Sequence, residues 1–300
     1  MTTTTRQEAA ALAGIRVRAG VRRRLWHLLA TQPLGTIGVF LIGLVVVVAI
    51  FAPFIAGQDP LTVNADMRLT GMSGRHFFGT DEYGRDVFAR VVFGARTSLR
   101  VGFVAIGIGA VCGTTIGLLT GYFGGIFDLL VQRMMDSIMA FPALVLALTI
   151  ISALGASEVN LFIVLGIVMT PGLSRVVRGS VLSVKENVYI EAGKSIGCGH
   201  PRIILVHILP NILAPIIIIA TAGLGSCILI EASLSFLGLG TPPPKPSWGQ
   251  MLSGAGRYYF EVAPWIAIFP GVAISLAVLG FNMLGDALRD VWDPRLRGTR

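Results

Sequence analysis

The sequence predicts an all-α integral membrane protein with six transmembrane helices. Of its 300 residues, 54% are hydrophobic and only 13% are charged, whereas soluble domains carry about 25% charged residues. The charges gather in a few clusters that are separated by long charge-free runs. None of these runs shows the period-2 alternation of a barrel strand, so helices are the expected spanning elements.

The charge-free runs place the spans along the chain. Five runs are long enough for a spanning helix, which needs about 20 mostly apolar residues. A sixth run, Val159 to Ser174, is short but has Glu158 and Arg175 as interfacial anchors. Prolines at positions 142 and 171 are expected to interrupt the third and fourth spans. The expected spans are about 35–57, 99–121, 130–155, 159–177, 211–235 and 264–285, between an N-terminal arm (1–34) and a tail (287–300).

The distribution of basic residues predicts the orientation. Six arginines precede the first span, with no acid after Glu8. An excess of Lys and Arg marks the cytoplasmic side, so both termini and the segment 180–202 are expected in the cytoplasm. Anchoring against anionic lipid also accounts for the net charge of +8, so we expect no nucleic-acid partner. The first run is too long for a signal peptide, and Phe54 stands where cleavage needs a small residue.

Two segments of the first half have recognisable packing signals. The outer segment 58–98 is expected to hold a short surface helix that leads into the second span and is capped by the cluster Thr80-Asp81-Glu82. The second span carries glycines four residues apart, which share one helix face and predict the close approach of another helix. These are Gly109, Gly113, Gly117 and Gly121.

The tripeptide Gly193-Lys194-Ser195 has the spelling that ends a phosphate-binding loop. That loop needs a glycine five positions before Gly193, and Val188 stands there without a preceding strand. An amphipathic helix is expected instead over 182–196, ended by Gly197 and followed by a second helix from Pro201. Its apolar stripe would lie on lipid or dock into a protein groove, and consists of Val184, Val188, Ala192 and Ile196.

Other classes of membrane protein find little support. The three cysteines have no paired spacing and the four histidines are scattered, so neither a cofactor, a metal site nor an enzyme is expected. A stand-alone channel or secondary transporter would place ionisable residues at mid-membrane. Glu231 is the nearest candidate, either lining a passage or packed against a polar neighbour.

A resemblance to one family rests on motifs from the first span to the tail. Glu191-Ala192-Gly193, Gly197 and Leu209-Pro210 resemble the EAA loop of permease subunits in bacterial ABC importers. Gly193 replaces an alanine, and His207 an isoleucine, although HILPN is usual in the dipeptide, oligopeptide, nickel and glutathione permease family. Further stretches resemble the C-type permease of these systems, namely FGTDEYGRDVFARVVFGARTSL, GYFGG, SLSFLGLG, PSWGQML and GFNMLGDALRDVWDPRLRG.

The resemblance implies a type I importer permease of the bacterial inner membrane, with residues 35–286 as its permease domain. Such a subunit is not itself an enzyme. It pairs with a paralogous permease, with two cytoplasmic ATPases that use Mg-ATP, and with an extracytoplasmic substrate-binding protein. The implied substrate is a short peptide, with glutathione or a nickel or other metal chelate as alternatives. The EAA loop (181–210) would contact an ATPase through Glu191, Ala192, Gly193 and Gly197, with Lys194 and Arg202 at the rim.

Overall fold

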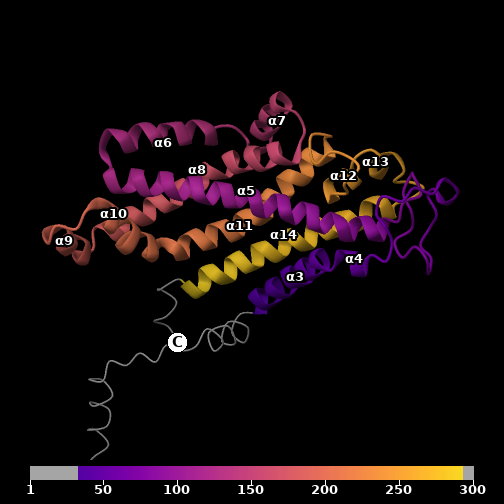
Figure 1. Ribbon diagram of the computed structural model, residues 1–300, viewed down its shortest axis with the longest axis horizontal. Helices are drawn as coiled ribbons and strands as arrows, with labels where there is room; N and C mark the ends of the chain where they lie inside the picture. Colours follow the sequence, from indigo (N-terminus) through magenta and orange to yellow (C-terminus); the bar gives the residue numbers. More distant parts are fainter. Residues whose placement is uncertain (1–32, 293–300) are drawn as a thin grey trace, which may run out of the picture.

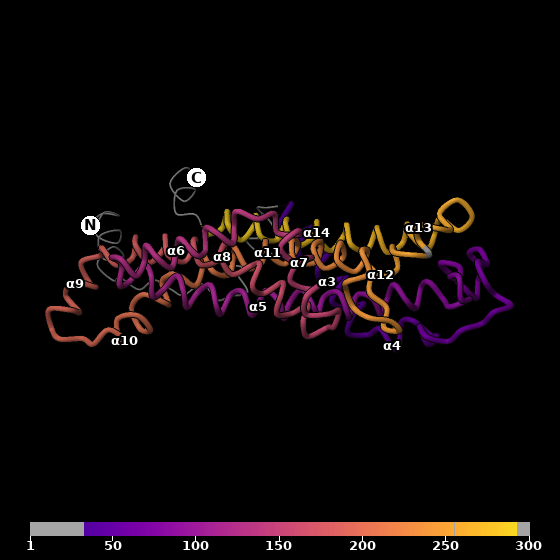
Figure 2. The backbone as a smooth tube through the Cα atoms, turned by 90° about the horizontal axis from the view of Figure 1, so that it is seen from above, coloured from indigo at the N-terminus to yellow at the C-terminus, as the bar shows by residue number. Residues whose placement is uncertain are grey.

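The computed structural model of the chain describes residues 33–292, which form an elongated, flattened bundle of helices (Figures 1 and 2). Apart from α7 (Ala143–Leu154), which is bent by 90° from the helix before it, the long helices run along its length, and the short ones lie at its two ends. Among these residues the only β-type pairing is an isolated bridge between Thr80 and Asp86. The long helices are α3 (Pro33–Ile50), α5 (Val87–Phe123), α6 (Gly125–Met139), α7 (Ala143–Leu154), α8 (Glu158–Lys185), α11 (Leu209–Phe236) and α14 (Trp265–Trp292).

The short elements divide between the ends of the bundle. One end, which we call the loop end, holds α9 (Val188–Ser195), α10 (His200–Arg202) and the π-helix η2 (Ile203–Ile208). The other, the outer end, holds α4 (Ala52–Ile55), η1 (Ala65–Met67), α12 (Trp248–Leu252) and α13 (Ala255–Tyr258). Two predicted segments lie outside the described residues, namely residues 1–32 of the expected arm and residues 293–300 of the expected tail.

Five helices are long and apolar enough to cross a membrane, and α6 with α7 makes a sixth candidate span that is bent by 90°. The bend follows Met139, where Pro142 stands in an extended conformation before α7. Pro171, in contrast, lies inside α8 without ending it. The expectation that both prolines interrupt their spans is therefore wrong for Pro171.

The second span is one helix of 37 residues, not a surface helix followed by a span. It begins at Val87 because Asp86, rather than the expected cluster Thr80-Asp81-Glu82, supplies its N-cap. The Asp86 Oδ1 atom accepts a hydrogen bond of 2.7 Å from the N–H of Ala89. The charges that bounded the expected span lie on its first turns, and one of them, Arg96, donates to the last carbonyls of α3 (Ala49 and Ile50).

The glycine face of α5 packs against α8 in the most extensive helix contact of the bundle. A Cβ atom added at Gly113 would lie 2.6 Å from the Cβ of Leu173, and one at Gly117 would lie 2.6 Å from the carbonyl oxygen of Ser174. These separations leave no space for a side chain. The predicted close approach is thus confirmed, and α8 is the helix that makes it. We call this contact the glycine seam.

The glycine seam predicts that Gly113→Ala destabilises the bundle. The added methyl group must displace Leu173 or separate the two helices, and such overpacking costs about 1–3 kcal/mol. The measurement is the free energy of unfolding in detergent micelles. Gly107→Ala is the matched control, because Gly107 lies on the same helix with no atom within 4 Å of an added Cβ. Equal stability of the two variants would show that the seam is not close-packed.

Candidate functional site

The segment expected as one helix over 182–196 is two helices in the structure. Helix α8 runs to Lys185, and α9 begins only at Val188. Asn187 separates them in an extended conformation, and its side-chain amide donates to the carbonyl of Val184 over 2.8 Å. Asparagine competes in this way for free carbonyls at helix ends. The expectation of a continuous helix is wrong because this local bond ends α8.

Helix α9 ends in a Schellman motif. The N–H of Cys198 donates to the carbonyl of Gly193 over 3.0 Å, and the N–H of Gly197 donates to the carbonyl of Lys194 over 3.0 Å. Gly197 has a φ of +82°, the left-handed conformation that this motif requires. Pro201 then lies in the first turn of α10. The chain therefore turns back through a fixed set of backbone hydrogen bonds.

Helix α10 continues into α11 through a π-turn. The N–H of Leu209 bonds to the carbonyl of Ile204, five residues earlier, and Pro210 follows without an N–H of its own. Residues His200–Phe236 thus form one helical stretch with a local irregularity. The second helix from Pro201 does run into the bundle, and it carries the loop directly into α11.

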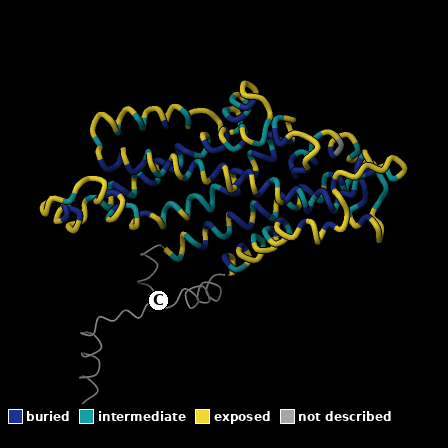
Figure 3. Tube along the Cα trace, viewed as in Figure 1, coloured by how far each residue is buried: buried dark blue, intermediate teal, exposed yellow. Residues whose placement is uncertain are grey.

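One face of α9 is held by the bundle and the other is exposed (Figure 3). Ile190 is only 1% exposed and packs in a cluster with residues of α5, α8, η2 and α11. Val188 and Ile196 are 80% and 81% exposed, although both are large apolar side chains. The predicted apolar stripe therefore faces outward, apart from Val184, which is partly buried.

The predicted contact residues lie in two settings. Glu191, Ala192 and Lys194 are exposed on α9, whereas Gly193 is buried on its inner side. Gly197 lies at the turn and Arg202 is exposed on α10. Among the described residues, the Glu191 carboxylate has no hydrogen-bond or ion-pair partner.

The tripeptide Gly193-Lys194-Ser195 forms the last turn of α9, and the Ser195 hydroxyl donates to the carbonyl of Glu191. Its backbone N–H groups therefore belong to a helix and are not arranged as an open phosphate-binding loop.

Two side chains at the loop end were missed by sequence reasoning. The Tyr122 hydroxyl lies 2.7 Å from Nδ1 of His200, which joins the end of α5 to α10. The Lys194 ammonium lies 5.8 Å from the centre of the Tyr122 ring. The GYFGG stretch contains Tyr122 but gives no sign of this contact, because His200 is 78 residues away in the sequence.

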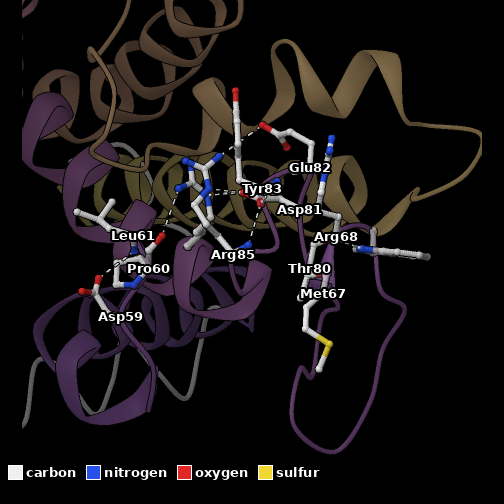
Figure 4. A network of polar contacts seen from close by, with 12 residues as sticks. Asp59, Pro60, Leu61, Met67, Arg68, Thr80, Asp81, Glu82, Tyr83 and Arg85 are labelled. Carbon is white, nitrogen blue, oxygen red and sulfur yellow. Dashed lines mark hydrogen bonds and ion pairs between the residues drawn. The ribbon is translucent and has the colours of Figure 1, made fainter. Parts of the chain in front are cut away.

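A network of polar contacts organises the outer end before α5 (Figure 4). The Asp81 carboxylate accepts hydrogen bonds from the backbone N–H groups of Tyr83 and Arg85, both over 2.9 Å, and from Nε of Arg85 over 2.6 Å. Arg90 lies 3.5 Å from the same carboxylate. Burial and the adjacent Asp81 charge raise the pKa of Glu82. Asp81 thus stabilises the turn that precedes α5.

Glu231 lies fully buried near the outer end of α11. Its Oε1 atom accepts a hydrogen bond of 2.7 Å from the Ser235 hydroxyl. The same hydroxyl lies 3.5 Å from that of Ser247, in the segment that leads to α12. Of the two readings of Glu231, packing against a polar neighbour is the one that agrees with this geometry.

Comparison with known families places most of the chain in one group. Residues 113–298 match the family described as "Binding-protein-dependent transport system inner membrane component". Residues 21–71 match the "N-terminal TM domain of oligopeptide transport permease C". The first match alone covers more than half of the sequence and includes α9, α10 and the π-turn.

Several curated proteins are similar over nearly the whole chain. The "Dipeptide transport system permease protein DppC" of Alkalihalophilus pseudofirmus is 46% identical over 92% of this chain and 90% of its own length. A putative peptide transport system permease protein of Brucella suis is 43% identical over 87% of this chain and 88% of its own length. The "Glutathione transport system permease protein GsiD" of an Escherichia coli O6:K15:H31 strain is 42% identical over 91% and 90%.

A solved structure shares the fold. It is the MetNI methionine ABC transporter in inward-facing conformations. One of its chains superimposes with a TM-score of 0.56 at 20% sequence identity, and the match covers 74% of this chain and 100% of the MetNI chain. The helical membrane bundle, the family match and the full-length relatives agree with one another. The chain therefore belongs to the family of binding-protein-dependent transport system inner membrane components, and it is a permease subunit of an ABC importer.

Proposed function

We propose that this permease serves the import of short peptides of the dipeptide or oligopeptide type. The observation that carries the proposal is the 46% identity to a dipeptide permease over 92% of the chain. The match of residues 21–71 to the N-terminal domain of an oligopeptide permease agrees with it. Glutathione is the second candidate, because a glutathione permease is 42% identical over a similar length.

The site proposed for coupling to an ATPase is the exposed face of α9. Val188 and Ile196 present apolar surface to solvent, and Glu191 and Lys194 lie on the same short helix. An amphipathic helix of this kind suits docking into a groove of a partner protein. Its inner side is held by Ile190, so a force applied to α9 is passed to the bundle and not lost in a flexible loop.

The proposed partners follow from this assignment. The loop end faces the cytoplasm and contacts one of two ATPase subunits, which bind and hydrolyse Mg-ATP, so that the chain itself is not catalytic. The outer end faces the substrate-binding protein. A paralogous permease completes the pathway through the membrane. In this orientation the start of α3 at Pro33 and the end of α14 at Trp292 lie toward the cytoplasm, as the positive-inside rule predicts.

A cavity in the side of the bundle supports a half-pathway in this subunit. It has a volume of about 640 Å³ and lies among α5, α6, α7, α8, α11 and α14. Its walls are mostly apolar, with Ser226 and Asn282 as the polar side chains. A concave, mostly apolar wall with a few polar groups is the usual lining of small-molecule sites, so this face is our candidate for the wall of the passage.

The substrate proposal is tested with the complete transporter in proteoliposomes. Uptake of a dipeptide, a longer peptide and glutathione is measured with the cognate binding protein, whose bound ligand is identified by mass spectrometry. Uptake of either peptide is the expected result. Uptake of glutathione without either peptide would replace the first candidate by the second.

Glu191→Arg is expected to weaken the attachment of the ATPase subunits. A reversed charge at the centre of the exposed face of α9 opposes docking, and a tenfold loss corresponds to about 1.4 kcal/mol. The measurement is the amount of ATPase that co-purifies with the permease, together with transport-coupled ATP hydrolysis. Glu261→Arg makes the same charge change at an exposed position of the outer end and serves as the control for ATPase co-purification. Full co-purification of Glu191→Arg would remove Glu191 from the proposed site.

The two glycines of the loop are expected to differ in their tolerance of alanine. Gly197→Ala forces a side chain into the left-handed region, at a cost of roughly 1–2 kcal/mol, and weakens the turn after α9. Gly193→Ala adds a methyl group with no atom within 4 Å and favours the helix by up to about 1 kcal/mol.

Melting temperature and transport-coupled ATP hydrolysis of the assembled transporter report on both variants. Both values should fall in Gly197→Ala and persist in Gly193→Ala. If Gly193→Ala alone lost coupling, flexibility within α9 and not rigidity of the turn would be the functional property.

A further inference from the structure

Three polar contacts converge on the last turn of α5 at the loop end. The Tyr122 hydroxyl lies 2.7 Å from Nδ1 of His200 on α10. The Lys194 ammonium of α9 lies 5.8 Å from the centre of the Tyr122 ring. The Lys185 ammonium, at the end of α8, donates to the carbonyl of Gly121 over 3.0 Å. Helices α8, α9 and α10 therefore each reach the same turn of α5.

The contact between Tyr122 and His200 differs in kind from the apolar packing around it. Tyr122 lies in the cluster that also holds Ile190 and Ile203, and its ring packs edge-on against that of His200. Apolar contacts are non-directional and allow neighbouring surfaces to slide. A short hydrogen bond has a preferred distance and angle, so it fixes the position of α10 relative to α5.

We infer that Tyr122 is a positioning residue for energy coupling, and that its hydrogen bond to His200 transmits displacement of α9 and α10 to α5. The inference rests on the proposed docking of an ATPase at α9 and adds the route by which movement leaves that site. Lys194 holds α9 over the same ring, so the two short helices move with Tyr122 as one unit.

Helix α5 is suited to carry such a movement to the other side of the membrane. It is unbroken over 37 residues, or roughly 55 Å at 1.5 Å per residue. The glycine seam holds it against α8 over residues 109–121, in the half of the helix nearer the loop end. At its outer end, Asp86 caps the helix and the Trp248 side chain donates to the carbonyl of Val91 over 2.9 Å. Displacement at Tyr122 is thereby communicated to the outer segments.

The test is the number of substrate molecules transported per ATP hydrolysed by the complete transporter. Tyr122→Phe keeps the ring, its packing and the Lys194 contact, and removes only the hydroxyl. The transport ratio is expected to fall about three- to tenfold, while the amount of co-purified ATPase and the melting temperature stay at wild-type values. Thr115→Val, which removes a hydroxyl of α5 that bonds to the carbonyl of Val111 in the same helix, is the matched control.

Variants of the partner test the bond itself. His200→Ala should lower the ratio as Tyr122→Phe does, and the double variant should be no worse than either single variant, because both remove the same interaction. His200→Asn should recover part of the ratio, since its side-chain amide offers a polar atom near the place of Nδ1. Additive losses in the double variant would overturn the inference.

Tyr122→Phe and Glu191→Arg test the role of Tyr122 and the docking site separately. A wild-type ratio in Tyr122→Phe, with ATPase lost in Glu191→Arg, would overturn the role of Tyr122 and leave the docking site intact. A lowered ratio accompanied by loss of ATPase from Tyr122→Phe would also overturn it, because Tyr122 would then merely shape the docking surface. ATPase retained in Glu191→Arg would instead contradict the proposed site.

Discussion

The rest of the structure depends on the close approach of α5 and α8 along the glycine seam. At Gly113 and Gly117 no side chain fits between the two backbones. In lipid, where the hydrophobic effect does not drive helices together, such close packing is a main source of helix association. The seam fixes one pair of helices, and α11 then packs against both of them. The loop end and the outer end are both built onto this pair.

The two ends use polar side chains to attach short segments to the same helix. At the outer end, Arg96 of α5 satisfies the last carbonyls of α3, and Trp248 of α12 bonds to the α5 backbone. At the loop end, Tyr122 of α5 meets His200 of α10. Between the two ends, apolar clusters fill the bundle, and two arginines of α8, Arg175 and Arg178, pair with Asp136 and Asp128 of α6. Directional bonds therefore attach the short segments at both ends to the long helices.

The spans could be predicted from sequence because the bilayer requires long apolar segments, and charges mark where these segments end. The helix boundaries could not be predicted in the same way, because a helix can continue past the charges at the edge of an apolar run. Helix α5, for example, extends back through Arg96 and Arg90 to its N-cap at Asp86. The break at Asn187 depends on one side-chain bond to Val184, and the pairing of Tyr122 with His200 joins residues 78 positions apart. The first contact spans only three residues, but the spacing of apolar residues does not mark it, and the second joins segments that are far apart in the sequence. The glycine face was predictable because its spacing matches the helical period, although its partner was not.

With Gly193 in the place of the motif alanine, the geometry of the turn after α9 is intact. Gly193 is helical and buried, with open space where a methyl group would stand, and its carbonyl is the acceptor that closes the turn after α9. That role belongs to the backbone and is open to either residue. The strict conformational requirement falls four positions later on Gly197, whose φ of +82° reverses the chain. Ile190 holds α9 from its inner side, and the Lys194 ammonium lies over the Tyr122 ring at its end. In proteins, tertiary packing contributes more to the stability of a short helix than the helix propensity of one residue does, so these contacts are the main source of rigidity at the loop end.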